Sequence, residues 1–299
     1  MERFKYHILM HVIILVWGFT GILGKLILLP PEIIVWYRII ITVISLLILF
    51  PIFKVPYLLK DKKDLGKLML VGIIVCLHWI TFYKAISLST ASLAVLCLST
   101  TTLHVSWIDP IIMKRRFSWI EFLFGVLVIF GIYYISADFS AAEYEVLAYG
   151  LTSALLAALF SVSNAKFAEK ISSSQIILYE MIAGVIFLTI VLFSKGQLTA
   201  ANLTMTISDF WWLLFLGIVC TSLAFVLMVD VVKKLGAFTA SLTINLEPVY
   251  TMVLAILILN ENEILGKKFY LGSAMIILVV IANAVVKSKM KKRLRRKLI

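Results

Sequence analysis

The sequence predicts an all-α integral membrane protein whose ten transmembrane helices form two inverted five-helix repeats. The first supporting observation is composition: 62% of the 299 residues are apolar, 15% are charged, and the mean hydropathy is +1.06. Soluble domains average about 45–50% apolar and about 25% charged residues. The other two observations are ten apolar stretches long enough to span a bilayer and a correspondence between the two halves of the chain. A soluble enzyme and a secreted disulfide scaffold are therefore excluded.

The expected spans are apolar runs separated by short linkers, such as Pro30-Pro31 and Ser194-Lys195-Gly196-Gln197. Each run is close to the about 20 residues that cross a bilayer as a helix. No linker is long enough to form an extramembrane domain. The runs lie near 7–29, 32–53, 67–87, 90–112, 118–136, 147–168, 174–194, 210–231, 236–259 and 267–287.

Lysine and arginine are unequally distributed between the two sides of the expected membrane. With the N-terminus inside, the inner segments carry 22 of these residues and the outer segments carry 5, while Arg38 lies within the second span. Cytoplasmic segments of membrane proteins are enriched in lysine and arginine. We therefore expect a multi-pass protein of the cell (plasma or inner) membrane, with both termini in the cytoplasm.

The basic end of the chain indicates a partner for this cytoplasmic face. The net charge is +12, and the segment from Lys287 to Ile299 holds eight lysines and arginines directly after the last span. Anionic headgroups attract such a segment, so we expect anionic lipids of the bilayer as its partner and no nucleic acid. Cys76, Cys97 and Cys220 lie in apolar stretches and are expected to be buried thiols, without disulfides or a bound metal.

The two halves of the chain correspond at a nearly constant offset of 142 to 147 residues. Each half has an odd number of expected spans, so the two copies must have opposite orientations in the membrane. Inverted repeats are typical of secondary transporters, whose substrate site lies near the midplane where the repeats meet. The corresponding pairs are Tyr37-Arg38 with Tyr179-Glu180, Gly72 with Gly217, Ala91 with Ala237, Ala94 with Ala240, and Gly125 with Gly272.

Six short motifs support a family resemblance. They are Trp17-Gly18-Phe19-Thr20, Trp36-Tyr37-Arg38, Phe82-Tyr83-Lys84-Ala85, Val232-Lys233-Lys234-Leu235-Gly236-Ala237, Leu246-Glu247-Pro248-Val249 and Leu259-Asn260-Glu261. In this order they resemble the drug/metabolite transporter superfamily, specifically its EamA-type ten-span exporters. The resemblance implies a first repeat over 1–140, a second over 145–287 and a basic cytoplasmic tail over 288–299. It also implies export of small metabolites, often amino acids.

The two repeats differ at two positions of these motifs. Thr102 stands where the mirrored span carries Pro248, and Arg115 stands where it carries Glu261. The first repeat is therefore expected to gate less symmetrically than the family pattern implies.

Glu247 is the leading candidate for a substrate-binding residue. It lies halfway along the expected span 236–259, where neither headgroup region is reachable. On a continuous helix, Thr239, Thr243, Glu247 and Tyr250/Thr251 would form one polar stripe, and Thr243 is a further candidate for the substrate site. Pro248 removes a backbone donor, so a kink is expected there. The carboxyl group either lines the substrate site, carries a coupled proton, or anchors neighbouring helices by hydrogen bonds.

Five further candidates for the site come from the first repeat. Thr101 corresponds to Glu247 and shares a helix face with His104, and His78 lies on a polar face of the third span. Trp17 and Trp79 are near the middle of their spans and could form aromatic walls of a cavity. Packing within the bundle is the alternative for each of these side chains.

Two charged residues within spans have several possible roles. Arg38 is expected to reach the outer headgroups with its long side chain, to act as a structural hydrogen-bond hub, or to contact substrate. Glu180 is at the corresponding position of the second repeat and is expected to be a solvated carboxylate of the inner vestibule, unless it is functional. Asp209 is expected to be a solvated loop charge.

These observations favour a secondary transporter that exports a small metabolite by alternating access, with proton coupling as one option. A flippase for a lipid or lipid-linked metabolite is the alternative, and an integral-membrane enzyme is disfavoured because the four histidines all lie in the first half. No Walker motif is present, so direct use of ATP is not expected. We expect no cofactor and no metal. Because both repeats are fused in one chain, a functional monomer is expected.

Overall fold

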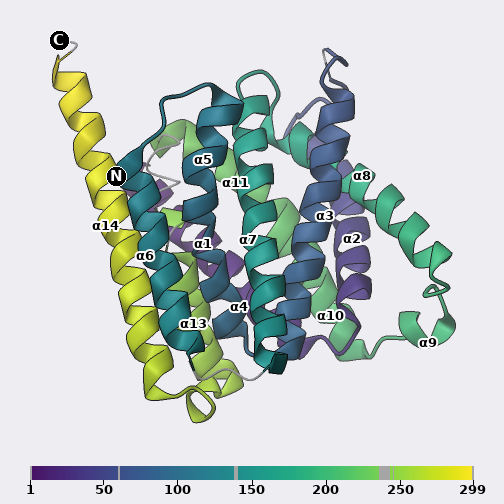
Figure 1. Ribbon diagram of the computed structural model, residues 1–299. Coiled ribbons are helices and arrows are strands. Elements are labelled where there is room, and N and C mark those ends of the chain that lie inside the picture. The colour runs from purple at the N-terminus through teal and green to yellow at the C-terminus, as the bar shows by residue number, and fades with distance from the viewer. Residues whose placement is uncertain (1, 60, 138–140, 236–242, 245, 298–299) are drawn as a thin grey trace.

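The protein is a bundle of helices (Figure 1). The computed structural model describes residues 2–59, 61–137, 141–235, 243–244 and 246–297. Within these residues no strand occurs, and nine helical segments are long and apolar enough to cross a membrane. Glu247–Leu259 is a shorter apolar helix within the expected ninth span, of which 236–242 and 245 lie outside the described residues. The prediction of an all-α membrane protein is confirmed.

The observed helices follow the expected spans closely. The spans expected near 32–53, 118–136 and 174–194 differ from the helices by one residue at most at each end. The first half contains α1 (Glu2–Leu26), α2 (Pro31–Ile52), α3 (Leu65–Leu88), α4 (Ala91–Leu98), α5 (Thr101–Met113) and α6 (Trp119–Ser136). The second half contains α7 (Ala141–Phe167), α8 (Ser173–Ser194), α9 (Ala200–Leu203), α10 (Ile207–Leu214), the π-helix η1 (Phe215–Leu223), α11 (Ala224–Leu235), α13 (Glu247–Leu259), η2 (Glu261–Glu263) and α14 (Lys267–Lys297).

Two pairs of corresponding helices have equal lengths and similar ends. Helices α2 and α8 both have 22 residues, and each is followed by a residue with positive φ, Lys54 (53°) and Gly196 (63°). Helices α5 and α13 both have 13 residues and end at Lys114 (55°) and Asn260 (53°), again with positive φ. Left-handed residues commonly terminate helices because they let the next amide groups bond back to the last turn. The sequence repeat is therefore also a repeat of local structure.

The fourth span is broken, although a continuous helix was expected near 90–112. Helix α4 ends at Leu98 and α5 begins at Thr101, with a turn at Ser99 and Thr100 between them. The Thr100 hydroxyl donates to the carbonyl of Cys97 at 2.7 Å. Short hydroxyl side chains compete with the helical backbone for such carbonyls, and a run of four of them here interrupts the helix. Thirteen residues rise about 20 Å, so a helix as short as α5 cannot span the about 30 Å hydrocarbon core by itself.

The corresponding helix α13 begins at Glu247, and Pro248 lies in its first turn. A proline is tolerated there because the amide it lacks would have no helical partner. The kink expected within the ninth span is therefore replaced, in the described residues, by a helix start. Thr239 of the expected polar stripe lies outside those residues, whereas Thr251 donates to the carbonyl of Glu247 at 3.1 Å.

The eighth span contains a π-helical segment, η1, that the sequence did not indicate. Thr221 donates its hydroxyl to the carbonyl of Leu216 at 2.8 Å, and Ser222 donates to that of Gly217 at 2.9 Å. Both acceptors lie five residues back, which is the spacing of the widened backbone. Such segments are frequent at functional sites because they turn side chains away from the regular helical positions.

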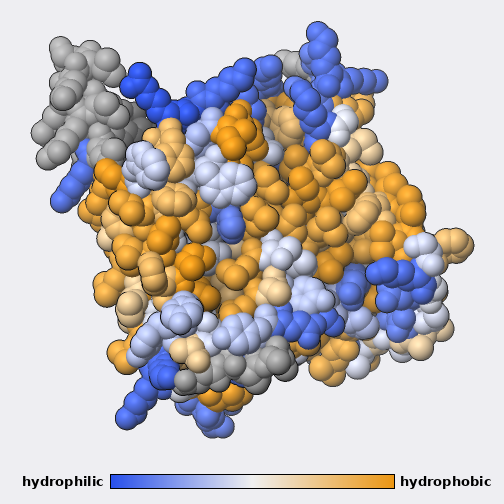
Figure 2. All heavy atoms as spheres, viewed as in Figure 1, coloured by the Kyte–Doolittle hydropathy of each residue, from blue (hydrophilic) through white to orange (hydrophobic). Residues whose placement is uncertain are grey.

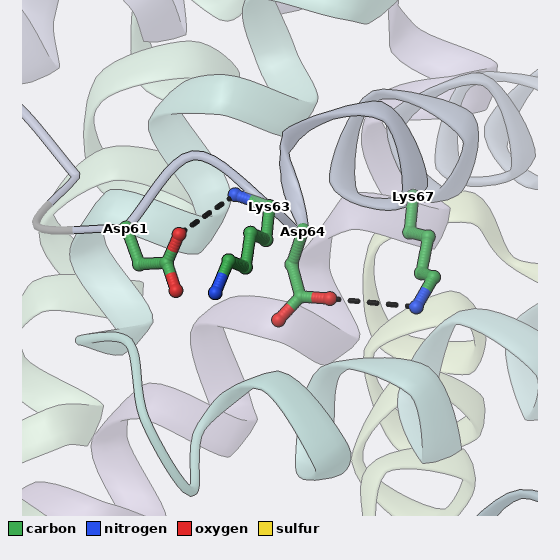
Figure 3. Close-up of polar contacts among 4 residues, drawn as sticks. All are labelled: Asp61, Lys63, Asp64 and Lys67. Carbon is green, nitrogen blue, oxygen red and sulfur yellow. Dashed lines mark hydrogen bonds and ion pairs between the residues drawn. The ribbon is translucent and has the colours of Figure 1, made fainter.

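Polar and apolar side chains are separated along the bundle axis. Figure 2 shows a broad apolar band between polar groups at the two ends of the view. The N-terminal part of α1, the C-terminal part of α14 and the α2–α3 loop lie toward the upper end (Figure 1). In that loop, Asp61 accepts a bond from the Lys63 amide at 3.0 Å, and Lys67 pairs with Asp64 at 3.5 Å (Figure 3). The bundle therefore has the layered surface of a multi-pass membrane protein.

Two carboxylates stabilise the opposite end of the bundle. Asp209, expected to be a solvated charge, is only 2% exposed; it forms a capping box with Thr206 and accepts a bond from the Leu28 amide at 2.9 Å. Glu261 is 3% exposed and accepts the amides of Ala91 and Ser92 at 2.7 and 3.1 Å. These amides open α4, and a carboxylate at a helix N-terminus satisfies donors that have no partner within the helix. Glu261 thus connects the second half of the chain to the first.

We expect Glu261→Ala to lower the free energy of unfolding by about 1–2 kcal/mol, because two buried amides lose their acceptor. Glu263→Ala is the matched control, since Glu263 lies in the same short helix but is exposed. Denaturation of both variants in mixed micelles measures the difference. Equal stabilities of the two variants would contradict this role of Glu261.

Candidate functional site

Arg38 lies inside the bundle, seven residues after the start of α2. It is 4% exposed, so the predicted reach to the outer headgroups is wrong. Its Nε donates to the Thr221 hydroxyl of η1 at 3.1 Å, and Nη1 donates to the Tyr83 hydroxyl of α3 at 3.3 Å. The guanidinium carbon is 3.7 Å from the centroid of the Trp79 ring. Stacking on an aromatic face offsets part of the cost of burying this cation.

The backbone around Arg38 is fixed by contacts between α2 and η1. Thr42 donates its hydroxyl to the carbonyls of Arg38 at 2.7 Å and Gly217 at 3.2 Å. One turn further, Ser45 and Ser222 share a hydrogen bond between their hydroxyls. A side chain at Gly217 would also approach the Arg38 carbonyl to 3.3 Å. The π-helix and α2 therefore hold the guanidinium group in one orientation.

His78 and Thr101 are connected through adjacent residues of α7. The His78 Nδ1 is 2.9 Å from the Ser153 carbonyl and 2.8 Å from the Ser153 hydroxyl, and Thr101 donates to the Ala154 carbonyl at 3.3 Å. His78 precedes Trp79 on α3 and is close enough to Arg38 for electrostatic interaction. The structure thus brings four predicted residues, Arg38, Trp79, His78 and Thr101, into one connected region.

Glu247, at the start of α13, lies near this region. Its carboxyl group lies within electrostatic range of Arg38, and the ion pairs of the described residues do not include one between the two. The side chain is partly exposed although α13 begins within the apolar part of the bundle. A cationic and an acidic group thus lie near each other without neutralising each other directly, which suits a ligand that carries both charges.

Three predicted residues have no described contact with Arg38. Trp17 packs on Phe225 at a centroid distance of 5.3 Å, and its Nε1 is buried without a partner. His104 packs against Trp107 at 6.3 Å and likewise has a buried Nδ1 without a partner. Thr243 is 9% exposed.

Two residues that hold Arg38 were not foreseen as its partners. Tyr83 was expected to line a cavity or, preferably, to anchor its span at the membrane interface, yet it is 1% exposed and its hydroxyl accepts a bond from the guanidinium group. Thr221 is a polar residue directly after the repeated Gly217–Cys220 segment, inside an apolar run. A hydroxyl in such a run is the signal that could have identified it. Glu180, expected to be solvated, is 2% exposed, and its described hydrogen bond is with Asn164.

The described residues contain no group of three His, Cys, Asp or Glu side chains that could hold a metal ion. The region around Arg38 offers charge, hydrogen bonds and an aromatic face for recognition. The donors are the guanidinium group of Arg38 and the hydroxyls around it, and the acceptor is the Glu247 carboxyl group.

Comparison with known proteins gives a family match in both halves of the chain. The sequence profile described as the EamA-like transporter family matches residues 4–137 and 145–285. No curated protein matches the chain in a sequence search. Among solved structures, one described only as the crystal structure of a protein superposes with a TM-score of 0.67 at 14% sequence identity, covering 97% of this chain and 98% of that chain. This likeness concerns the fold alone.

Proposed function

The chain belongs to the EamA-like transporter family of the drug/metabolite transporter superfamily, and on that premise we propose that it exports a small zwitterionic metabolite, such as an amino acid, by alternating access. The observation that carries the proposal is the arrangement of Arg38 and Glu247. The guanidinium group of Arg38 would bind the carboxylate of the substrate in a bidentate way. The carboxyl group of Glu247 would accept a hydrogen bond from its ammonium group.

The two half-length helices support the same assignment. Helices α5 and α13 begin inside the apolar part of the bundle, at Thr101 and Glu247. The N-terminus of a helix carries partial positive charge and free amides, and transporters use such interrupted helices to bind anionic groups near the midplane. A carboxylate substrate would therefore be favoured by these helix ends in addition to Arg38.

The equivalent packing of the two halves supports alternating access by inverted repeats. Gly72 of α3 packs against the backbone of Glu180 in α8, and the corresponding Gly217 packs against Arg38 and Ile41 in α2. Two copies with equivalent contacts and opposite orientations can exchange conformations, so that one site opens to either side. We propose that protons, bound by a carboxyl group of the bundle, drive this exchange.

The orientation that accompanies this proposal places the α2–α3 loop in the cytoplasm. In intact cells, we expect an impermeant thiol reagent to label Lys195→Cys and to leave Lys63→Cys unlabelled until the cells are permeabilised. Both side chains are exposed, and the three natural cysteines are buried and would be replaced. Labelling of Lys63→Cys alone in intact cells would reverse the orientation and the direction of export.

The substrate class is tested by thermal unfolding of the purified protein with a panel of small molecules. We expect amino acids to stabilise it more than their deaminated acids or decarboxylated amines, because binding raises stability by RT ln(1 + [L]/Kd). Glu247→Gln should weaken amino-acid binding by about tenfold or more, the value of one charge-assisted hydrogen bond. The affinity for a deaminated acid should be unchanged.

Glu263→Gln is the control for a lost surface carboxylate. Stabilisation by a lipid or lipid-linked metabolite alone would instead favour a flippase. Normal binding by Glu247→Gln with loss of pH-dependent transport would assign Glu247 to proton coupling and not to recognition of the amine.

A further inference from the structure

A second buried polar site lies where α7, α8 and α3 meet, apart from Arg38. Glu180 of α8 is 2% exposed, and its Oε2 accepts a hydrogen bond from Asn164 Nδ2 of α7 at 3.2 Å. The other oxygen of each group, Glu180 Oε1 and Asn164 Oδ1, is buried without a partner. Buried acceptors almost always have a donor, so two such oxygens on one bonded pair need an explanation.

We propose that Glu180 and Asn164 form a proton-binding site. A primary amide and a carboxylic acid can form a ring of two hydrogen bonds, of which one is already present. A proton on Oε1 would donate to Asn164 Oδ1 and complete the ring, which satisfies both oxygens at once. An ionised carboxylate would leave two acceptors facing each other in a buried environment, which is costly.

The neighbouring charged groups do not neutralise Glu180. Lys166 of α7 pairs with Glu169, Lys67 of α3 pairs with Asp64, and Lys233 of α11 pairs with Asp230. Arg38 of α2 is bound to Thr221 and Tyr83. Of the thiols and histidines on α3, Cys76 is buried and His78 is bonded to Ser153. Within the described residues, no cation forms an ion pair with Glu180.

A proton fits this site better than a metal cation. Hard cations in proteins take about six oxygen ligands, whereas this pair offers two free oxygens. The site also connects helices that must move together. A Cβ atom at Gly72 of α3 would lie 2.3 Å from the Glu180 carbonyl, so α3 and α8 are in backbone contact here. Proton release would leave the α7–α8 contact unsatisfied, and on the proposed transport function this couples proton movement to the opening of the bundle.

Infrared spectroscopy of the purified protein tests the site without any transport measurement. The carbonyl stretch of a protonated carboxyl group is resolved from that of a carboxylate. At neutral pH we expect Glu180→Gln to lose the band of one carboxylic acid. The controls are Glu169→Gln, which removes an exposed carboxylate, and Glu247→Gln, which removes another acidic group of the bundle. A spectrum of Glu180→Gln identical to that of the wild type would overturn the proposal.

Asn164→Leu tests the pair while Glu180 is kept. The acid would lose its partner, so its carbonyl band should shift in frequency. An unshifted band would show that the two groups do not share a proton. A band that changes to that of a carboxylate when sodium replaces choline in the buffer would identify a metal cation as the occupant and would also overturn the proposal. Failure of amino-acid binding in the panel above would refute the substrate assignment and leave this site intact.

Discussion

Replacing Arg38 by Gln is expected to reduce transport by about 10- to 140-fold. The variant removes the cation proposed to bind the substrate carboxylate, and a charged hydrogen-bond pair contributes about 1.5–3 kcal/mol, with each 1.4 kcal/mol equal to a factor of ten. Three contacts are lost in addition, with the Thr221 hydroxyl at 3.1 Å, the Tyr83 hydroxyl at 3.3 Å and the Trp79 ring at 3.7 Å. Uptake of a stabilising amino acid into proteoliposomes would measure the effect.

Arg38→Lys separates recognition from folding. It keeps a buried positive charge but lacks the planar fork that allows bidentate binding and stacking on Trp79. We expect this variant to fold and to retain less than about a tenth of the wild-type rate. Arg116→Gln, which removes an exposed cation, should transport normally. Wild-type rates for Arg38→Lys together with unchanged substrate selectivity would show that Arg38 supplies only charge to the fold.

The second large effect concerns folding. We expect Gly72→Ala to destabilise the protein by about 3 kcal/mol or more, the upper range for overpacking a close contact. Its Cβ atom would lie 2.3 Å from the carbonyl oxygen and 2.7 Å from the Cα atom of Glu180. Both are backbone atoms, so no side-chain rotation relieves the contact, and α3 would have to separate from α8.

Gly66→Ala, in the same helix, should raise the free energy of unfolding, whereas Gly72→Ala lowers it. Nothing lies within 4 Å of the Cβ position at Gly66, so the better helix propensity of alanine should stabilise the protein by up to about 1 kcal/mol. Gly217→Ala should fall between the two, because its nearest contacts are the Cγ2 and Cβ atoms of Ile41 rather than backbone atoms. Unfolding in mixed micelles gives all three values. A Gly72→Ala variant as stable as Gly66→Ala would mean that α3 and α8 are not in backbone contact.

The spans were predictable because each depends on local composition alone. An apolar run of about 20 residues must bond its own backbone inside a bilayer, and this gave α2, α6 and α8 to within one residue at each end. The interruption at Ser99 and Thr100 was within reach of the same reasoning, because a run of hydroxyl residues competes for backbone carbonyls. The π-helix η1 could not be predicted in this way, since its sequence has the pattern of an ordinary apolar span.

The candidate site was only partly predictable for a related reason. The sequence determined which charged and polar residues lie inside spans, and the repeat determined that Arg38 and Glu180 occupy corresponding positions. Only the tertiary structure decided their partners, because a buried polar group is satisfied by whichever helix packs against it. In the tertiary structure, Arg38 contacts Thr221, Tyr83 and Trp79, and Glu180 is hydrogen-bonded to Asn164. The sequence by itself determined the class of protein, since this follows from local hydropathy, whereas the contacts of its buried charges depend on packing between helices that no local pattern encodes.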